Sequence, residues 1–239
     1  GEIYHGGYSQ LAKVKKEFLI KKPTNISNKE AMVMGTAGFT ALLCALAINA
    51  REALLLGEKV NDVLVTGASG GVGSVAVMAL TKMGYNVTAV TGKPESSEML
   101  KKLGAKNIIN RSDFEGEPKL LGKAIWDGVV DTVGGNILAH AISQTKHSGI
   151  VAACGNAGGV KLNTNVMPFI LRGVKLWGVD SIQVSMKRRE FVWSQVEKLI
   201  DFKILEELVH VINMDELIKI YPKILKGQIS GRVVVDVNK

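Results

Sequence analysis

The chain has 239 residues, 46% of them hydrophobic and 22% charged, which excludes a disordered or fibrous protein and predicts one large core, or one core and a small lobe. Its 30 basic and 22 acidic residues give a net charge of +8, a value that suits nucleic acid, an anionic surface or a phosphate-rich ligand. The basic clusters are short and are not interleaved with aromatic residues, which make up only 5% of the chain, so we expect solvated faces and neither a nucleic-acid nor a membrane partner.

The first part of the chain carries turn signals and then one long uncharged stretch. Residues 1–35 have an alternating pattern and contain the turn residues Gly6, Gly7 and Pro23, which predicts an irregular β-rich lobe. No basic stretch followed by an apolar run stands at the start, so no signal peptide is predicted and the chain reads as a fragment or a processed chain. Residues 31–50 are uncharged, but only residues 41–48 are continuously apolar, which favours a buried helix over a membrane span.

The middle of the chain alternates short apolar runs with longer helix-like segments, which is typical of a parallel sheet covered on both faces. Helices are predicted over residues 72–83 and 95–103, each followed by a glycine. A further helix and a terminal strand, residues 232–237, are predicted near the carboxyl end. The fold class is therefore α/β, a doubly wound parallel sheet (Rossmann fold) with a partial second domain formed by both chain ends. The expected sheet strands are residues 62–66, 87–91, 107–109, 128–133, 150–154 and 175–179.

A glycine-rich turn follows the first of these strands. Residues 66–73 read TGASGGVG, and a helix is predicted directly after them. Backbone N–H groups at the start of that helix can hold a pyrophosphate if no Cβ blocks its approach, and Gly70 and Gly73 leave that room. With Ala68 in the first position, the pattern is one substitution from the dinucleotide-binding fingerprint.

The end of the second strand indicates which dinucleotide is bound. An NAD site usually has an acidic residue there for the ribose hydroxyls, whereas this chain has Thr91, Gly92 and Lys93. A hydroxyl, a flexible backbone and a cation suit a 2′-phosphate. Arg111 follows the third strand and is either a second cation for that phosphate or a solvated arginine. The cofactor expected is NADPH.

Other nucleotide enzymes are excluded by their own motifs. The short-chain dehydrogenases need a Tyr-x-x-x-Lys pair, and no tyrosine in this chain has a lysine four residues later. A P-loop is excluded because no Gly-Lys pair has a glycine at the required upstream position.

The cysteines and histidines do not predict a metal site. The four histidines lack metal-ligand spacing, and two cysteines are too few for a disulfide framework or a four-thiolate zinc site, so we expect no metal and a cytoplasmic location. Cys154 ends a strand and is interpreted as a small buried residue rather than a nucleophile. Arg172 is expected to pair with either a phosphate or a carboxylate.

Seven blocks of sequence together resemble the zinc-independent medium-chain dehydrogenase/reductase superfamily, and the last two resemble its acryloyl-CoA reductase and quinone oxidoreductase branch. The resemblance covers nearly the whole chain. The blocks, in chain order, are residues 35–41 (GTAGFTA), 66–73 (TGASGGVG), 103–105 (LGA), 131–135 (DTVGG), 154–159 (CGNAGG), 167–174 (MPFILRGV) and 178–181 (GVDS).

The resemblance implies a domain division. Residues 1–37 would belong to a GroES-like catalytic domain, most of which family members carry before the position of Gly1. Residues 38–208 would be the NADP-binding Rossmann domain, and residues 209–239 would return to the catalytic domain. Family members also pair as dimers, often through the coenzyme domains, so a homodimer is expected.

The resemblance also implies site residues. The pyrophosphate would face the glycine turn, the 2′-phosphate would lie by the second and third strands, and the nicotinamide would lie farther along the sheet. Asn156 departs from the leucine common in the family, so only its backbone contact is implied. The implied cofactor-binding residues are Gly70, Gly71, Val72, Gly73, Thr91, Gly92, Lys93, Arg111, Asn156, Ile170, Ser181 and Asn238.

The expected activity is hydride transfer from NADPH to the β-carbon of an α,β-unsaturated thioester or to a quinone, both small-molecule acceptors. No residue has a clear claim as proton donor, so no catalytic residue is assigned. Two other classes stay open. One is a module that binds NADPH without catalysis, and the other is a basic nucleic-acid-binding protein whose affinity would fall steeply with salt.

Overall fold

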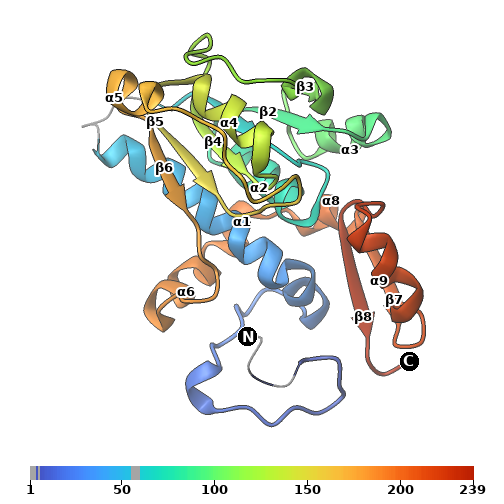
Figure 1. Ribbon diagram of the computed structural model, residues 1–239. Helices are drawn as coiled ribbons and strands as arrows, with labels where there is room; N and C mark the ends of the chain where they lie inside the picture. The colour runs from blue at the N-terminus through green and yellow to red at the C-terminus, as the bar shows by residue number, and fades with distance from the viewer. Residues whose placement is uncertain (1–3, 5, 55–59) are drawn as a thin grey trace.

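A computed structural model describes residue 4, residues 6–54 and residues 60–239 (Figure 1). Its centre is a sheet of six parallel strands in the order β3-β2-β1-β4-β5-β6, which is the doubly wound Rossmann order. The chain therefore reverses its direction across the sheet between β1 and β4. The strands are β1 (Asp62–Val65), β2 (Asn86–Thr91), β3 (Asn107–Asn110), β4 (Trp126–Asp131), β5 (Thr145–Ala153) and β6 (Lys175–Gly178).

All six predicted strands are present. The largest difference is in β5, which begins at residue 145 rather than 150. Its pairing with β4 shifts register between Trp126 and Gly128, and Ser148 has a φ of 57° there. This irregularity interrupts the apolar run, so the first half of the strand could not be recognised from its sequence.

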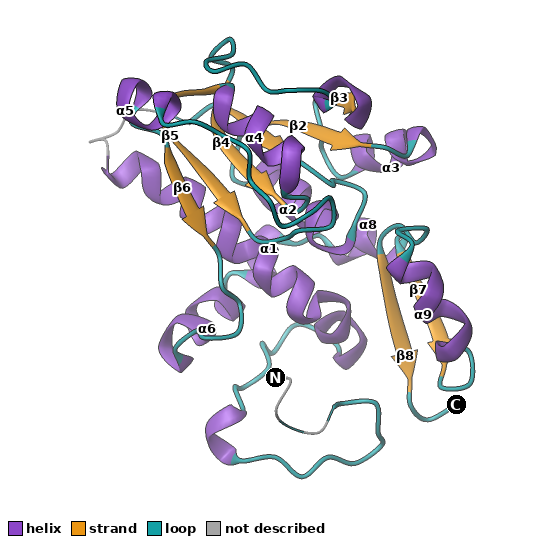
Figure 2. Cartoon of the chain, in the orientation of Figure 1, coloured by secondary structure: helices purple, strands orange, loops and turns teal. Residues whose placement is uncertain are grey.

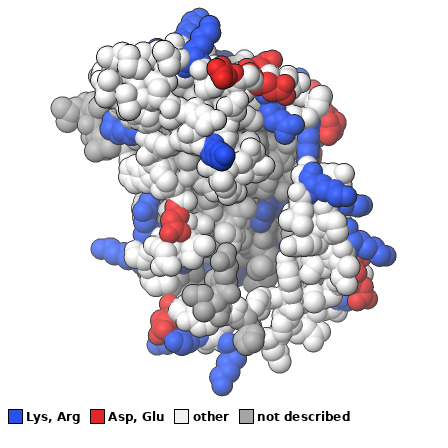
Figure 3. All heavy atoms as spheres, in the orientation of Figure 1, with Lys and Arg blue, Asp and Glu red and all other residues white. Residues whose placement is uncertain are grey.

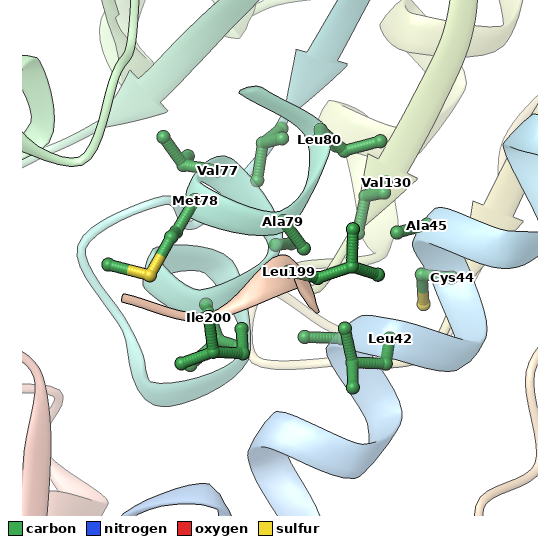
Figure 4. Packing of buried hydrophobic residues seen from close by; sticks show 14 of the residues in the cluster. Leu42, Cys44, Ala45, Val77, Met78, Ala79, Leu80, Val130, Leu199 and Ile200 are labelled. Carbon is green, nitrogen blue, oxygen red and sulfur yellow. The ribbon is translucent and has the colours of Figure 1, made fainter. Parts of the chain in front are cut away.

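Helices cover both faces of the sheet because side chains alternate along each strand. On one face Val63 and Val65 of β1 pack with α1 (Asn28–Leu54) and α2 (Gly71–Lys82). Figure 4 shows Leu42 of α1, Leu80 of α2 and Val130 of β4 in the same layer. On the other face Leu64 packs with Leu138 and Ile142 of α4 (Gly135–Ser143). Two apolar layers thus hold the sheet, and its strand ends are left for chemistry.

The other helices around the main sheet are short, and all but η1, which precedes α1, lie between or after the strands. They are η1 (Lys16–Phe18), η2 (Pro94–Ser96), α3 (Ser97–Lys102), η3 (Arg111–Phe114), α5 (Met167–Arg172), α6 (Met186–Ser194), α7 (Val196–Leu199) and α8 (Phe202–Glu206).

Helix α1 contains the uncharged stretch and is a core helix. By length and composition its segment Asn28–Ala50 could cross a membrane, but 67% of its most apolar window is buried inside the fold. Leu42, Cys44 and Ile48 are fully buried. Gly35 kinks the helix with a φ of 45° and a ψ of −153°, a conformation that favours glycine.

The two chain ends differ in how well they match the expected β-rich lobe. Among the described residues before α1 there is the η1 turn but no strand, so the β-rich expectation for residues 1–35 is wrong for that part of the chain. Short alternating runs form strands only where a neighbouring strand offers hydrogen bonds. The carboxyl end does form strands: β7 (Val209–Asn213) and β8 (Arg232–Asp236) pair in parallel, joined by α9 (Leu217–Leu225) beside the main sheet (Figure 2).

The predicted domain boundary after residue 37 falls inside α1, two residues beyond its kink. The division into residues 1–37, 38–208 and 209–239 stays a prediction.

Candidate functional site

The glycine turn joins β1 to α2 at the carboxyl end of the sheet, beside the point where the strand order reverses. A Cβ on Gly73 would lie 2.3 Å from the carbonyl oxygen of Gly67 and 2.6 Å from the Cα of Ala68, so only glycine lets the helix start this close to the strand. The first backbone N–H groups of α2, those of Gly71, Val72 and Gly73, have no acceptor within the helix. They are a ready cradle for a phosphate.

The side chains of Thr66, Asp131 and Thr132 fix this turn to the end of β4, the neighbouring strand in the sheet. The Thr66 hydroxyl donates to Asp131 Oδ1 at 2.6 Å, and Asp131 Oδ2 accepts the backbone N–H of Gly134 at 2.8 Å. The Thr132 hydroxyl donates to the carbonyl of Thr66 at 2.9 Å. Burial raises the pKa of Asp131, against the lowering effect of the Thr66 hydroxyl and the backbone N–H groups of Gly134 and Val133. Sequence reasoning gave Asp131 no role, although a polar residue that ends a buried strand was a usable signal.

The residues predicted to hold the 2′-phosphate lie together next to the turn. The Thr91 hydroxyl lies 3.0 Å from the hydroxyl of Ser69 in the turn and accepts the backbone N–H of Lys93 at 3.0 Å. The Arg111 guanidinium packs against Gly92, where an added Cβ would lie 3.1 Å from the Arg111 Cζ. Thr91, Gly92, Lys93 and Arg111 thus adjoin the cradle of Gly70 to Gly73.

The segment that leads into β8 also reaches this site, which the sequence did not predict. The Lys93 ammonium donates to the carbonyl of Ile229 at 2.9 Å and to the hydroxyl of Ser230 at 3.2 Å. The backbone N–H of Gly231 donates to the carbonyl of Ser69 at 3.1 Å. These contacts join residues 136 to 162 positions apart in sequence, so no local pattern could have revealed them.

Arg232 places a second cation at the start of α2. Its Nε donates to the carbonyl of Val33 at 2.8 Å, and its Nη1 lies 2.5 Å from the position that a Cβ on Gly71 would take. Burial lowers the pKa of this guanidinium. Among the described residues no carboxylate lies within 4 Å of it. A half-buried cation therefore adjoins the cradle.

A cavity of about 410 Å³ opens at the carboxyl ends of β5 and β6, where the nicotinamide side is expected. Asn156 lines the cavity, and Ser181 is the next residue in sequence after Asp180, which also lines it. Arg189 of α6 donates to the carbonyl of Ser181 at 3.2 Å and lies over the ring of Phe39, so the loop after β6 is held against α1. The cavity is lined by Ala153, Cys154, Gly155, Asn156, Gly178, Val179 and Asp180.

Two predicted residues lie apart from this group. Ile170 is 68% exposed on α5, which leads into the amino end of β6, the opposite edge of the sheet. Asn238 is exposed beyond the far end of β8, about 20 Å along the strand from Arg232. The structure does not bring these two residues together with the glycine turn.

Two residues of uncertain role now have partners. The Arg172 guanidinium donates to the carbonyls of Ser143, Thr145 and Gly122 at 2.9, 3.2 and 2.7 Å, so it joins two backbone segments through their carbonyls rather than pairing with a carboxylate of the described residues. The half-buried Cys154 thiol donates to the Asp131 carbonyl at 3.4 Å. Its contact with the Cys44 thiol lowers the pKa of Cys154 and raises that of Cys44.

Neither a patch of charge on the face drawn in Figure 3 nor a cluster of metal ligands in the described residues marks a second site. Lys and Arg side chains are scattered over the face drawn in Figure 3 rather than gathered into one patch. Within the described ranges, no three His, Cys, Asp or Glu residues are grouped as a metal site.

The chain is similar in sequence to known oxidoreductases. A family model described as zinc-binding dehydrogenase matches residues 71–201. Acrylyl-CoA reductase AcuI of Ruegeria pomeroyi is 44% identical over 239 residues, which are 100% of this chain and 72% of that protein. "Putative quinone oxidoreductase YhfP" of Bacillus subtilis is 43% identical over 96% of this chain and 69% of that protein.

Solved structures of such proteins also match. YhdH of Escherichia coli K-12, crystallised with bound NADPH, has a TM-score of 0.91 at 42% identity and covers 98% of this chain and 71% of its own. The YhfP structure, crystallised with NAD, has a TM-score of 0.87 at 42% identity and covers 94% of this chain and 68% of its own.

Proposed function

The chain belongs to the zinc-independent medium-chain dehydrogenase/reductase superfamily, in the family of acryloyl-CoA reductases and quinone oxidoreductases, and from this premise we propose that it is an NADPH-dependent oxidoreductase. The observation that carries the proposal is the phosphate cradle of α2 with three cations, Lys93, Arg111 and Arg232, around it and no carboxylate within 4 Å of any of them in the described ranges. Such a site favours a ligand with several phosphates. NADPH has three.

The residues present fit this cofactor. The amides of Gly71, Val72 and Gly73 would hold its pyrophosphate, because the cradle is open where Gly70 lacks a side chain. Lys93 and Arg111 would hold the 2′-phosphate with Thr91. The ring end would lie in the cavity by Asn156 and Ser181, where the glycines let a flat group approach the backbone.

Bound NADPH supplies a hydride, and the acceptor that best suits it is an activated double bond conjugated to a thioester, as in acryloyl-CoA, with a quinone as the alternative. The positive charge of the site also attracts the phosphates of a coenzyme A ester, which a quinone lacks. This difference makes the thioester the first choice.

The proposal is tested by binding first and turnover second. The 239-residue chain is titrated with NADPH by fluorescence, and NADPH oxidation is then followed with acryloyl-CoA, crotonyl-CoA and a small quinone. Saturable binding with turnover of a thioester is expected. Binding without turnover of any acceptor would favour the non-catalytic module, and absence of binding would overturn the oxidoreductase proposal.

The cofactor choice has its own test. Lys93→Glu replaces the ammonium next to the 2′-phosphate by a carboxylate, so NADPH affinity should fall by about 100-fold while NADH affinity changes little. Lys102→Glu, a change of equal charge on an exposed residue of α3, is the control. An unchanged ratio of the two affinities in Lys93→Glu would contradict a 2′-phosphate site.

We also propose a homodimer through β6. This edge strand is exposed along its length and carries Leu176 and Trp177, 39% and 38% exposed. An uncovered apolar edge strand is a template for pairing with a second copy. Leu176→Lys should shift the protein from dimer to monomer in analytical ultracentrifugation, and a wild-type chain that sediments as a monomer would refute the proposal.

A further inference from the structure

Lys93 is held by the carboxyl-terminal part of the chain rather than by a carboxylate. Its half-buried ammonium has two acceptors, the carbonyl of Ile229 and the hydroxyl of Ser230. An ammonium has three donor hydrogens, so one is available for a further partner. The cation is thus positioned but not neutralised.

A second hydroxyl converges on the same point. Ser96, 4% exposed in η2, lies with its Oγ 3.5 Å from that of Ser230. The ammonium of Lys93 and the hydroxyls of Ser96 and Ser230 can all donate hydrogen bonds, and a phosphate oxygen is the acceptor that takes several charge-assisted donors at once. The cluster has the chemistry of a phosphate-binding corner.

The position of Ser230 is fixed by its neighbour. Gly231 has a φ of 72° and donates its N–H to the Ser69 carbonyl in the glycine turn. A Cβ there would lie 2.4 Å from the carbonyl oxygen of Leu208, so no other residue fits without a backbone shift. Ser230 is therefore held against Lys93 by the same segment that adjoins the cradle.

We propose that Ser230 is a specificity-determining residue, which completes the 2′-phosphate site with Lys93 and Ser96 and favours NADPH over NADH. This inference rests on the proposed function. It assigns part of the cofactor specificity to the segment before β8, far in sequence from the β2 end where such specificity is usually sought.

The test compares NADPH and NADH affinities in Ser230→Asp and Ser230→Ala. The aspartate would pair with Lys93 and repel the phosphate, so NADPH affinity should fall by about tenfold or more and NADH affinity by less than about twofold. Ser230→Ala removes one hydrogen bond and should weaken NADPH alone, by about threefold. Gln228→Asp places the same charge on an exposed residue two positions earlier and should leave the ratio unchanged.

The outcomes separate the two proposals. If both Ser230 variants keep the wild-type ratio while Lys93→Glu changes it, the role of Ser230 is refuted and the cofactor proposal stands. Equal losses for both nucleotides would mean that Ser230 is only structural, which also refutes the inference. If the wild-type chain binds neither nucleotide, the proposed function fails and the inference fails with it.

Discussion

The two ends of the parallel sheet treat charge in opposite ways. At the amino end the Lys146 ammonium lies 2.9 Å from a carboxylate oxygen of Asp62 and 3.0 Å from one of Asp127. At the carboxyl end Lys93, Arg111 and Arg232 have no carboxylate within 4 Å among the residues that the structure describes. At one end the cation has carboxylate partners within the chain, and at the other the cations have none and lie beside open backbone amides.

This difference in charge between the two ends of the sheet indicates that residues for stability and residues for cofactor binding lie at opposite ends of the strands. A cation that is partly buried without a counter-ion costs free energy, and an anionic ligand that binds only the folded chain recovers it. Changes at the carboxyl end should therefore alter cofactor affinity, and changes at the amino end should alter stability alone.

The largest expected effect is that of Gly73→Ala in the glycine turn. The added Cβ would meet backbone atoms of Gly67 and Ala68 at 2.3 and 2.6 Å, so the start of α2 must move and its amides with it. We expect NADPH affinity to fall by more than about 100-fold and the free energy of unfolding to fall by about 2–4 kcal/mol. Fluorescence titration and urea unfolding measure the two effects.

Gly70→Ala separates binding from folding at the same turn. Its Cβ would lie 3.3 Å from the Gly67 carbonyl, a contact that a small shift relieves, but it would stand where the pyrophosphate approaches. NADPH affinity should fall while stability changes by less than about 1 kcal/mol. A variant that binds NADPH as tightly as the wild type would contradict the proposed cradle.

A smaller effect, on stability alone, is expected from Lys146→Met at the amino end. The change leaves Asp127, whose side chain is 9% exposed, without its cation, and we expect a loss of about 1–3 kcal/mol in the free energy of unfolding. NADPH affinity should not change, because the ion pair lies at the amino ends of the strands and the cradle lies at their carboxyl ends. A loss of affinity in a stably folded Lys146→Met would refute the separation of the two ends.

An exposed ion pair provides the control for this variant. The Lys102 Nζ lies 2.6 Å from the Glu207 Oε2, and the two side chains are 60% and 57% exposed. Exposed ion pairs of this kind contribute little to the free energy of unfolding. Lys102→Met should lower the free energy of unfolding by less than about 0.5 kcal/mol. Equal losses in Lys102→Met and Lys146→Met would mean that burial does not strengthen the amino-end pair.

The sheet and the glycine turn could be predicted from sequence because each is a local pattern. Strands buried on both faces, such as β1 and the second half of β5, contain continuous apolar runs, residues 63–65 and 150–153, and the turn has its glycines within eight residues. The partners of Arg172 could not be predicted, since backbone carbonyls carry no sequence signal. Nor could the contacts of Ser230 and Arg232, because they depend on how the carboxyl end folds back onto the turn.

The smallest effect is the pH dependence of the amino end, which isolates the same ion pair. Burial opposes the ionisation of Asp127, but the N–H of Asp62, the Lys146 ammonium and the N–H of Asn61 together lower its pKa below the usual value. Its contribution to stability is then complete above the pKa of the unfolded chain and is lost as the pH falls through the lower pKa of the folded chain.

In Lys146→Met the ammonium donor to Asp127 is gone, so the pKa of Asp127 should be less depressed and less stability should depend on its ionisation. The difference in unfolding free energy between wild type and Lys146→Met should therefore shrink as the pH is lowered from about 6 to about 3. Urea unfolding across that range measures it. The pKa of Lys146 is raised by Asp62 and Asp127 against the effect of burial, so on the alkaline side the difference should be complete below the pKa of the unfolded chain and be lost as the pH rises through the raised pKa of the folded chain. A difference that stays constant at every pH would mean that Lys146 stabilises the sheet by packing its alkyl chain. The ion pair of Lys146 would then make no contribution to stability at the amino end of the sheet.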